Sequence, residues 1–148
     1  MKWVKEIVAG LIESYDTNDV YELCDLLNIQ IQRKENKNEI KSYFCRSINS
    51  DEFIFINKEM SFKEEKYLVA HELGHAILHI DLDTTYYKCN KLINKCKLER
   101  QADYFASELL LSSINLDDYI YEGQTISGLA YDINVLEEVL NYKLNIPY

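Results

Sequence analysis

The sequence predicts an α+β fold, in which helices surround a short antiparallel sheet of about three strands. Strand-like segments rich in β-branched and aromatic residues follow one another between residues 29 and 57. Two long helical patterns come after them, and a capping-box pair precedes the first. The length of 148 residues, of which 47% are hydrophobic, suits one domain with its own core.

The N-terminal residues are expected to form two helices. Apolar residues recur at helical spacing over Trp3–Ile12 and are interrupted by charged residues, which favours an amphipathic helix over a signal peptide. A second, short helix is expected at Asp19–Leu27, with Thr17 or Asn18 as its cap. No segment approaches the roughly 18 apolar residues of a membrane span, so no membrane partner is expected.

Three segments that follow have the patterns of strands. They are Ile29–Lys34, where apolar residues alternate with polar ones, Ile40–Arg46 and Glu52–Asn57. Turns are expected at Asn36–Asn38 and at Asn49–Asp51. These connections predict three consecutive antiparallel strands. The last strand can either pair with an extended substrate or serve only as a core strand.

Helices are expected to dominate the rest of the chain. Ser61 and Glu64 have capping-box spacing and open a helix from about Phe62 to His79. Residues 80–97 are polar and weakly periodic, which predicts a loop, and a third long helix is expected at about Leu98–Leu111. Residues 125–132 and 135–144 predict two short C-terminal helices.

The histidines of the chain all lie in VAHELGHAILH, residues 69–79, each four residues from the next. Positions i and i+4 share a helix face, so His71 and His75 can aim their rings at one metal ion. Glu72 points about 100° away and can reach a water molecule beside the metal without coordinating it. The alternative is a pair of helix histidines hydrogen-bonded to neighbours, and a third ligand has to decide between these interpretations.

His79 is not expected to be that third ligand. If the helix continues, His79 lies about 12 Å along the axis from His71. In HExxHxxGxxH sites a glycine breaks the helix, and Leu78 stands at that position here. We interpret His79 as a helix-end residue stabilised by the helix macrodipole.

A carboxylate from the next long helix is the better candidate. Glu99 and Asp103, in ERQAD, are i and i+4 and share a face. Glu99 can bind the metal, while Asp103 can accept the N–H of a liganding histidine and fix its orientation. The alternative is a solvated acidic face, which is common on surface helices.

Two histidines, one glutamate and an open position are typical of a catalytic zinc site, although Mn²⁺ or Fe²⁺ can use the same ligands. Zinc lowers the pKa of water from about 15.7 toward 7, and Glu72 would act as the base in peptide-bond hydrolysis. The donor that stabilises the oxyanion would be a tyrosine, arginine, lysine or backbone group, since the histidines are already assigned.

HELGHAILH followed by ERQADYFASELLL resembles the ImmA/IrrE-type metallopeptidases of bacteria, their phages and integrative elements. Members show HELGH and then E-x-x-A-(N/D)-x-F-A-x-x-L-L. The matching positions here are Glu99, Ala102, Asp103, Phe105, Ala106, Leu109 and Leu110. YDTNDVYELCDLLNIQIQ upstream and ISGLAYDINVLEEVLNYKL downstream are similar to the family's outer elements. Ser112 departs from the pattern, because the family usually has a proline shortly after the leucine pair.

The resemblance implies a small gluzincin-like metallopeptidase domain over residues 1–148. It divides into a catalytic core over about residues 1–112 and a C-terminal helical extension over about residues 113–148. It also implies a zinc-dependent endopeptidase that performs limited, regulatory proteolysis of a protein substrate. Relatives cleave a helix-turn-helix transcriptional repressor of a mobile element or stress response, so a DNA-binding repressor is the expected partner.

Two other classes of function compete with a peptidase. A non-catalytic partner-binding module of a mobile-element regulatory pair could keep the fold and lose a ligand or Glu72, whereas here the whole set is present. A DNA-binding protein would need basic residues on a recognition helix, yet Val135–Leu144 contains Glu137, Glu138 and only Lys143. The formal net charge of −9 also argues against nucleic-acid binding.

The four cysteines give a prediction about location. Without a CxxC motif or a secretory signal, reduced thiols in the cytoplasm are expected. Six residues separate Cys89 from Cys96, and a redox or metal role for this pair is the alternative left open.

Overall fold

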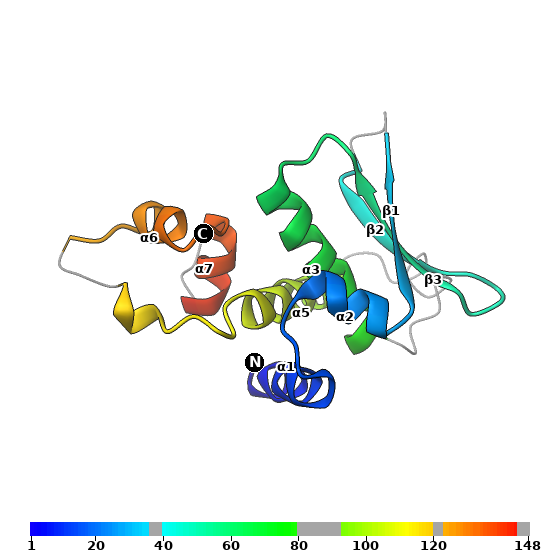
Figure 1. The fold of residues 1–148 in the computed structure, drawn as a ribbon, viewed down its shortest axis with the longest axis horizontal. Coiled ribbons are helices and arrows are strands. Elements are labelled where there is room, and N and C mark those ends of the chain that lie inside the picture. Colours follow the sequence, from blue (N-terminus) through cyan, green and yellow to red (C-terminus); the bar gives the residue numbers. More distant parts are fainter. Residues whose placement is uncertain (36–39, 80–92, 120–122, 145–148) are drawn as a thin grey trace.

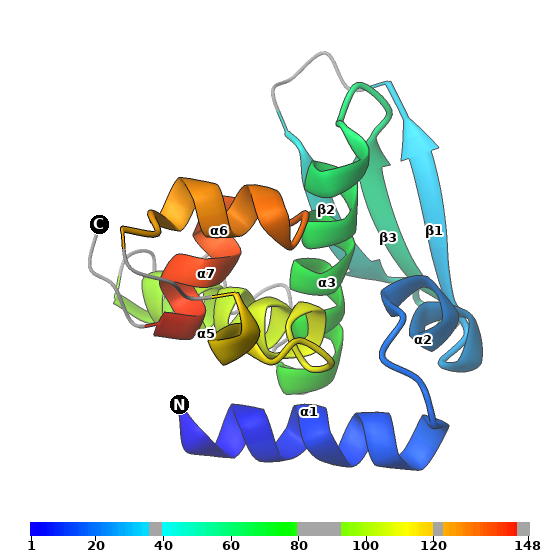
Figure 2. The same cartoon turned by 60° about the vertical axis from the view of Figure 1, so that its left-hand side comes forward.

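The computed structural model describes residues 1–35, 40–79, 93–119 and 123–144, and it confirms the α+β class (Figure 1). The elements in chain order are α1 (Lys2–Tyr15), α2 (Val20–Leu26), β1 (Ile29–Lys34), β2 (Ser42–Arg46), β3 (Glu52–Asn57), α3 (Phe62–Leu78), α5 (Ile93–Leu110), the 3₁₀ turn η1 (Leu116–Asp118), α6 (Ile126–Asp132) and α7 (Glu137–Leu144). Helix α3 lies between the sheet and the C-terminal helices α6 and α7 (Figures 1 and 2).

The sheet is mixed, and the expectation of antiparallel pairing throughout is wrong. Its strand order is β1-β3-β2, with β3 parallel to β1 and antiparallel to β2. The physical reason is burial: Ile54 and Ile56 are 0% and 1% exposed, so the most apolar strand takes the centre and the polar IQIQRK segment an edge. The expected turn at Asn36–Asn38 lies outside the described residues.

A turn at Asn49–Asp51 does join β2 to β3. The Ser47 N–H donates to the Asp51 carbonyl at 2.8 Å, and Ser50 takes the left-handed conformation at φ 67°. Because β2 pairs with β3 in this hairpin, Ser42 lies opposite Ile56 and faces α3.

The cap of α2 is Asp19, so the prediction of Thr17 or Asn18 is wrong. An Asp19 carboxylate oxygen accepts the N–H groups of Tyr21 and Glu22, both at 3.0 Å. Asp19 directly precedes the first helical residue, where a carboxylate reaches those amides. Thr17 instead accepts the Asp19 N–H at 3.1 Å and supports the cap.

The capping box of α3 is confirmed. The Ser61 hydroxyl accepts the Glu64 N–H at 3.4 Å, and the Glu64 carboxylate accepts the Ser61 N–H at 3.0 Å. Helix α5 begins at Ile93, so the prediction of a loop over residues 80–97 is wrong for residues 93–97, which are helical. The rest of that loop, residues 80–92, lies outside the described residues.

Helices α3 and α5 make the central contact of the molecule. A Cβ at Gly74 would lie 3.1 Å from Phe105 Cδ1 and 3.2 Å from Ala102 Cα. Val69, Ala70 and Leu73 of α3 pack in the same core as Phe105, Ala106 and Leu109 of α5. Glycine at position 74 therefore lets the two helix backbones approach closely.

The C-terminal helices pack on the end of α5. They share a second apolar cluster of buried residues, made of Leu111, Leu129, Ala130, Val139 and Leu140. The buried Ser107 hydroxyl donates to the Val139 carbonyl at 2.7 Å and ties α5 to α7. Whether residues 113–148 are a separate extension stays a prediction. In the described part of the chain, none of the helices has the length and apolar character of a membrane span.

The cysteines whose side chains are described, Cys24 and Cys45, are free thiols. Cys24 on α2 is buried, which raises the pKa of its thiol to about 12, and Cys45 on β2 is half-buried. Cys89 and the side chain of Cys96 lie outside the described residues, so the alternative role of that pair stays a prediction.

Candidate functional site

The crossing of α3 and α5 brings three potential metal ligands together. The Nε2 atoms of His71 and His75 lie 3.1 Å apart, one helical turn along α3. Glu99 of α5 places its Oε2 atom 3.3 Å from His71 Nε2 and 3.6 Å from His75 Nε2. These are the residues expected from the sequence, and their ligand atoms all lie within 4.8 Å of one another.

The spacing of these atoms fits a zinc ion. For Zn–N and Zn–O bonds of about 2.0–2.1 Å, two ligands of a tetrahedron are about 3.4 Å apart. The observed edges of 3.1, 3.3 and 3.6 Å scatter around this value. Two nitrogen ligands and one carboxylate are also the donor set of catalytic zinc.

Asp103 lies behind the ring of His71, on the side away from the other ligands. Its Oδ1 atom is 2.7 Å from His71 Nδ1 and also accepts the Tyr67 hydroxyl at 2.7 Å. Since a carboxylate only accepts, the proton of a neutral His71 ring belongs on Nδ1. In this neutral form the Nε2 lone pair is available to a metal ion, whereas in the charged form the Nε2–H group donates to Glu99.

Hydrogen bonds dominate the electrostatics of the group. Burial disfavours the charged form of His71, but hydrogen bonds to Asp103 and Glu99 outweigh it and raise the pKa of His71 to about 10. Hydrogen bonds from His71 and His75 hold the pKa of Glu99 well below its usual range. Burial also opposes ionisation of Asp103, yet hydrogen bonds from His71 and two tyrosines lower the pKa of Asp103 overall. Both carboxylates are therefore ionised, and the group favours a cation.

Glu72 is buried beside the group, where its side chain is held from the sheet. The Ser42 hydroxyl of β2 donates to Glu72 Oε1 at 2.7 Å. Glu72 is only 6% exposed, so this bond fixes a carboxylate that bulk water reaches poorly. Ser42 was not among the residues predicted from the sequence, because 30 residues separate it from Glu72 and the bond depends on strand register.

His79 is the C-cap of α3, which confirms its expected position at the helix end. The macrodipole interpretation does not hold, because burial lowers the pKa of His79 and favours the neutral ring. His79 Nδ1 lies 3.0 Å from His75 Nδ1, and His79 Nε2 lies 3.0 Å from Gln101 Oε1. Gln101, which is 8% exposed, was also not predicted from the sequence.

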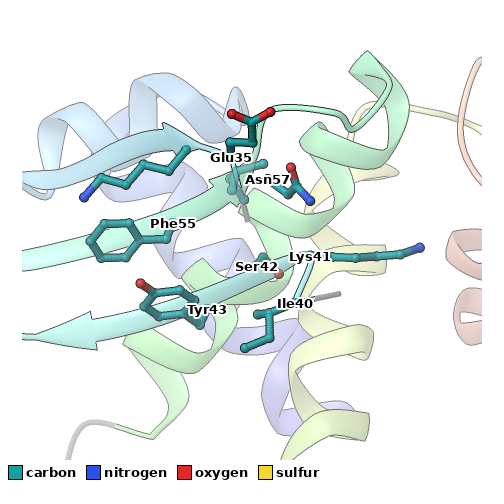
Figure 3. Close-up of a pocket in the computed structure, with 9 residues that line it drawn as sticks. Glu35, Ile40, Lys41, Ser42, Tyr43, Phe55 and Asn57 are labelled. Atoms are coloured by element: carbon teal, nitrogen blue, oxygen red, sulfur yellow. The ribbon is translucent and has the colours of Figure 1, made fainter. Parts of the chain in front are cut away.

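A hollow of about 460 Å³ lies at one end of the sheet, apart from the potential ligands (Figure 3). It is lined by Lys34, Glu35, Ile40, Lys41, Ser42, Tyr43, Phe55, Ile56 and Asn57. The rings of Tyr43 and Phe55 stack with their centroids 4.7 Å apart on neighbouring strands (Figure 3). Ser42 belongs both to this hollow and to the hydrogen bond with Glu72, so β2 connects the two places.

The idea that Glu52–Asn57 pairs with a substrate is wrong. This strand is β3, and both of its edges are already bonded, one to β1 and one to β2. Among the described residues, β2 has only β3 as a strand partner. The same strand carries Ser42, whose hydroxyl bonds to Glu72.

Comparisons with known proteins agree with this geometry. Residues 24–145 match the peptidase family model described as the IrrE N-terminal-like domain. The chain is 34% identical over 148 residues to Metallopeptidase ImmA of Bacillus subtilis (strain 168), covering 97% of this chain and 85% of that protein. It is 31% identical over 140 residues to Uncharacterized immunity region protein 2 of Bacillus phage phi105, covering 95% of this chain and 88% of that one.

A solved structure gives independent support for the fold. It is a Mycobacterium tuberculosis transcriptional regulator, with a TM-score of 0.68 at 12% identity. The similarity covers 98% of this chain but 47% of that one, so the chain spans about half of its length and the likeness concerns the fold alone. The family model and the sequence relatives show that the chain belongs to the ImmA/IrrE family of metallopeptidases.

Proposed function

We propose that the chain is a zinc-dependent endopeptidase that performs limited, regulatory proteolysis of a protein substrate. The observation that carries the proposal is the group of His71, His75 and Glu99 with tetrahedral spacing, beside the buried carboxylate of Glu72. The first three residues would hold the metal, and Glu72 would be the catalytic base. Asp103 would position His71.

Glu72 and Ser42 have separate roles in the proposed hydrolysis. When bound, zinc supplies a Lewis acid that activates water and polarises the scissile carbonyl. Glu72 accepts a proton from the attacking water at one carboxylate oxygen and delivers it to the leaving amine. The Ser42 hydroxyl holds the other oxygen, so the carboxylate does not rotate away between these two transfers.

The substrate would bind as an extended segment along β2. A sheet edge offers backbone hydrogen bonds to such a segment, and β2 is the strand whose Ser42 side chain bonds to Glu72. The hollow beside β2 is lined by Ile40, Tyr43 and Phe55, which suits an apolar side chain of the segment. The segment must be unfolded locally to bind in this way, which favours cleavage at an exposed linker of the substrate.

The proposed substrate class is a DNA-binding repressor of the helix-turn-helix type. The family resemblance supports this class, and so does the likeness to a phage protein named for an immunity region. Such a repressor acts on DNA in the cytoplasm, so we place the peptidase there. The formal net charge of −9 suits a basic protein partner and opposes direct binding to DNA.

Co-expression with the helix-turn-helix regulator encoded beside the gene tests activity and substrate together. We expect a discrete fragment with the wild-type chain and no fragment with Glu72→Gln, because general base catalysis contributes about 10²–10⁴-fold. Glu138→Gln makes the same change at an exposed glutamate of α7 and is expected to cleave normally. An intact regulator that co-purifies equally with all three chains would favour the partner-binding module instead.

Metal content tests the ligand assignment separately. We expect elemental analysis of the purified wild-type chain to find one zinc per chain, and Glu99→Ala to lose it. Glu138→Ala serves as the control for loss of an exposed glutamate. Zinc retained in Glu99→Ala and lost in His79→Ala would refute the choice of the third ligand.

A further inference from the structure

His79 and Gln101 form a hydrogen-bonded chain behind the proposed ligand His75. His75 Nδ1 lies 3.0 Å from His79 Nδ1, and His79 Nε2 lies 3.0 Å from Gln101 Oε1. We propose that His79 and Gln101 are positioning residues that fix the tautomer and orientation of His75, as Asp103 does for His71. This inference rests on the proposed metal site.

Only one assignment of donors and acceptors satisfies both hydrogen bonds among His75, His79 and Gln101 when the two rings are neutral. If His75 binds metal through Nε2, its proton is on Nδ1 and needs an acceptor. The atom in reach is His79 Nδ1, which accepts only if the His79 proton is on Nε2. That Nε2 then donates to the amide oxygen of Gln101, which can only accept. The amide oxygen of Gln101, as an acceptor, therefore favours in advance the same tautomers of both rings that metal binding at His75 Nε2 requires.

The end of α3 places His79 for this role. Its backbone N–H still donates to the His75 carbonyl at 3.1 Å, while φ −125° and ψ 37° turn the residue out of the helix. The two rings come to lie with their centroids 5.1 Å apart. His79 is four residues from His75, the spacing at which side chains of one helix face meet, so its ring lies beside that of His75 at the end of the helix.

Gln101 supports the chain of hydrogen bonds from α5. It lies between Glu99 and Asp103 in sequence, and its long side chain reaches the end of α3. Because Gln101 is 8% exposed, water does not readily take the place of its amide. Each of the three α3 histidines thus contacts an α5 side chain. Asp103 bonds to the first of them, His71, and Gln101 bonds to the last, His79.

The geometry also shows why His79 does not act as a ligand itself. Its contact is with Nδ1 of His75, whereas the ligand atoms of the group gather at Nε2. These two nitrogens lie on different sides of the imidazole ring. His79 is accordingly absent from the group of atoms that could hold one metal ion among the described residues.

Zinc affinity, measured by competition with a chromophoric chelator, tests the inference on the full-length chain. Gln101→Leu removes the acceptor, and we expect it to weaken Zn²⁺ binding by about 10–100-fold while one zinc per chain still binds. Gln101→Glu keeps an acceptor oxygen and is expected to stay within about threefold of the wild-type affinity. His79→Ala is expected to match Gln101→Leu.

Nitrogen NMR of the histidine rings in the metal-free chain, where no metal fixes the tautomer of His75, gives a readout that a packing role would not change. We expect the proton of His79 on Nε2 in the wild type and a mixture of tautomers in Gln101→Leu. Wild-type affinity in both Gln101→Leu and His79→Ala would overturn the inference and leave the proposed function intact. Failure of the wild-type chain to bind zinc, with Glu99→Ala no different, would overturn both.

Discussion

Replacing Gly74 by alanine is expected to force apart α3 and α5, the two helices that carry the proposed metal ligands. The new Cβ would lie 3.2 Å from Ala102 Cα and 3.3 Å from Ala102 O, both backbone atoms of α5. It would also lie 3.1 Å from the Phe105 ring. Backbone atoms cannot rotate aside, so α3 and α5 must separate by a few tenths of an ångström, about the amount by which these contacts are too short.

Two opposing effects set the change in the free energy of unfolding that Gly74→Ala causes. Alanine is favoured over glycine inside a helix by about 1 kcal/mol. Overpacking a close-packed contact costs about 1–3 kcal/mol. The control is Gly10→Ala in α1, where a Cβ would meet nothing within 4 Å. The helix term is common to both variants, so the difference in the free energy of unfolding between them measures the overpacking alone, at about 2 kcal/mol.

Urea unfolding of the metal-free chains is the assay for this difference. We expect Gly10→Ala to be more stable than the wild type by up to about 1 kcal/mol and Gly74→Ala to be less stable by a similar amount. Zinc affinity should fall in Gly74→Ala, because α3 carries His71 and His75 while α5 carries Glu99. Equal stabilisation by both substitutions would refute the close approach of the two helices.

Single contacts elsewhere in the chain give three further predictions. Ser42→Ala should lower kcat with little change in KM, because it frees the Glu72 carboxylate, and Ser42→Thr should restore much of the rate in a peptidase assay. Asp103→Ala should weaken Zn²⁺ binding about 10–100-fold in a chelator competition without abolishing it. Hydrogen bonds from Arg33 lower the pKa of Glu65 from its ordinary value of 4.5. The folded state is therefore stabilised by these bonds above pH 4.5, and this stabilisation is lost as the pH falls through the lowered pKa of Glu65. Glu65→Gln should therefore cost about 1–2 kcal/mol in urea unfolding at pH 7, and its difference from the wild type should shrink near pH 3, whereas a constant difference would contradict the ion pair.

Helices were predictable from the sequence because their signals are local. The capping box of Ser61 and Glu64 spans four residues, and the apolar spacing of α1 and α5 is read within a few turns. Strand pairing carries no such signal, since the register of Ile31 with Ile54 joins residues far apart in the chain. Short turns suggested hairpins throughout, but the burial of Ile54 and Ile56 required β3 at the centre of the sheet.

In the candidate site, too, placement on one helix face was predictable from the sequence, whereas the contact of Gln101 with His79 was not. The i, i+4 spacing of His71 with His75 and of Glu99 with Asp103 is enough to place each pair on one helix face. Gln101 was not predictable in this way, because it lies about 200° around the helix from Glu99. Only the crossing of α5 with the end of α3 brings it to a histidine.

That crossing also changes the interpretation of the two motifs. VAHELGHAILH alone supplies two proposed ligands, a proposed base and a third histidine, and ERQAD alone supplies polar side chains of a helix. Across the α3–α5 contact, Asp103 bonds to His71, Glu99 joins the two proposed histidine ligands, and Gln101 bonds to His79. Each partner is correctly placed only at the helix separation that a glycine at position 74 allows. Metal binding in this chain is therefore a property of the helix pair, and a relative with HExxH but a larger residue at that position would need a different packing of the second helix to form the same site.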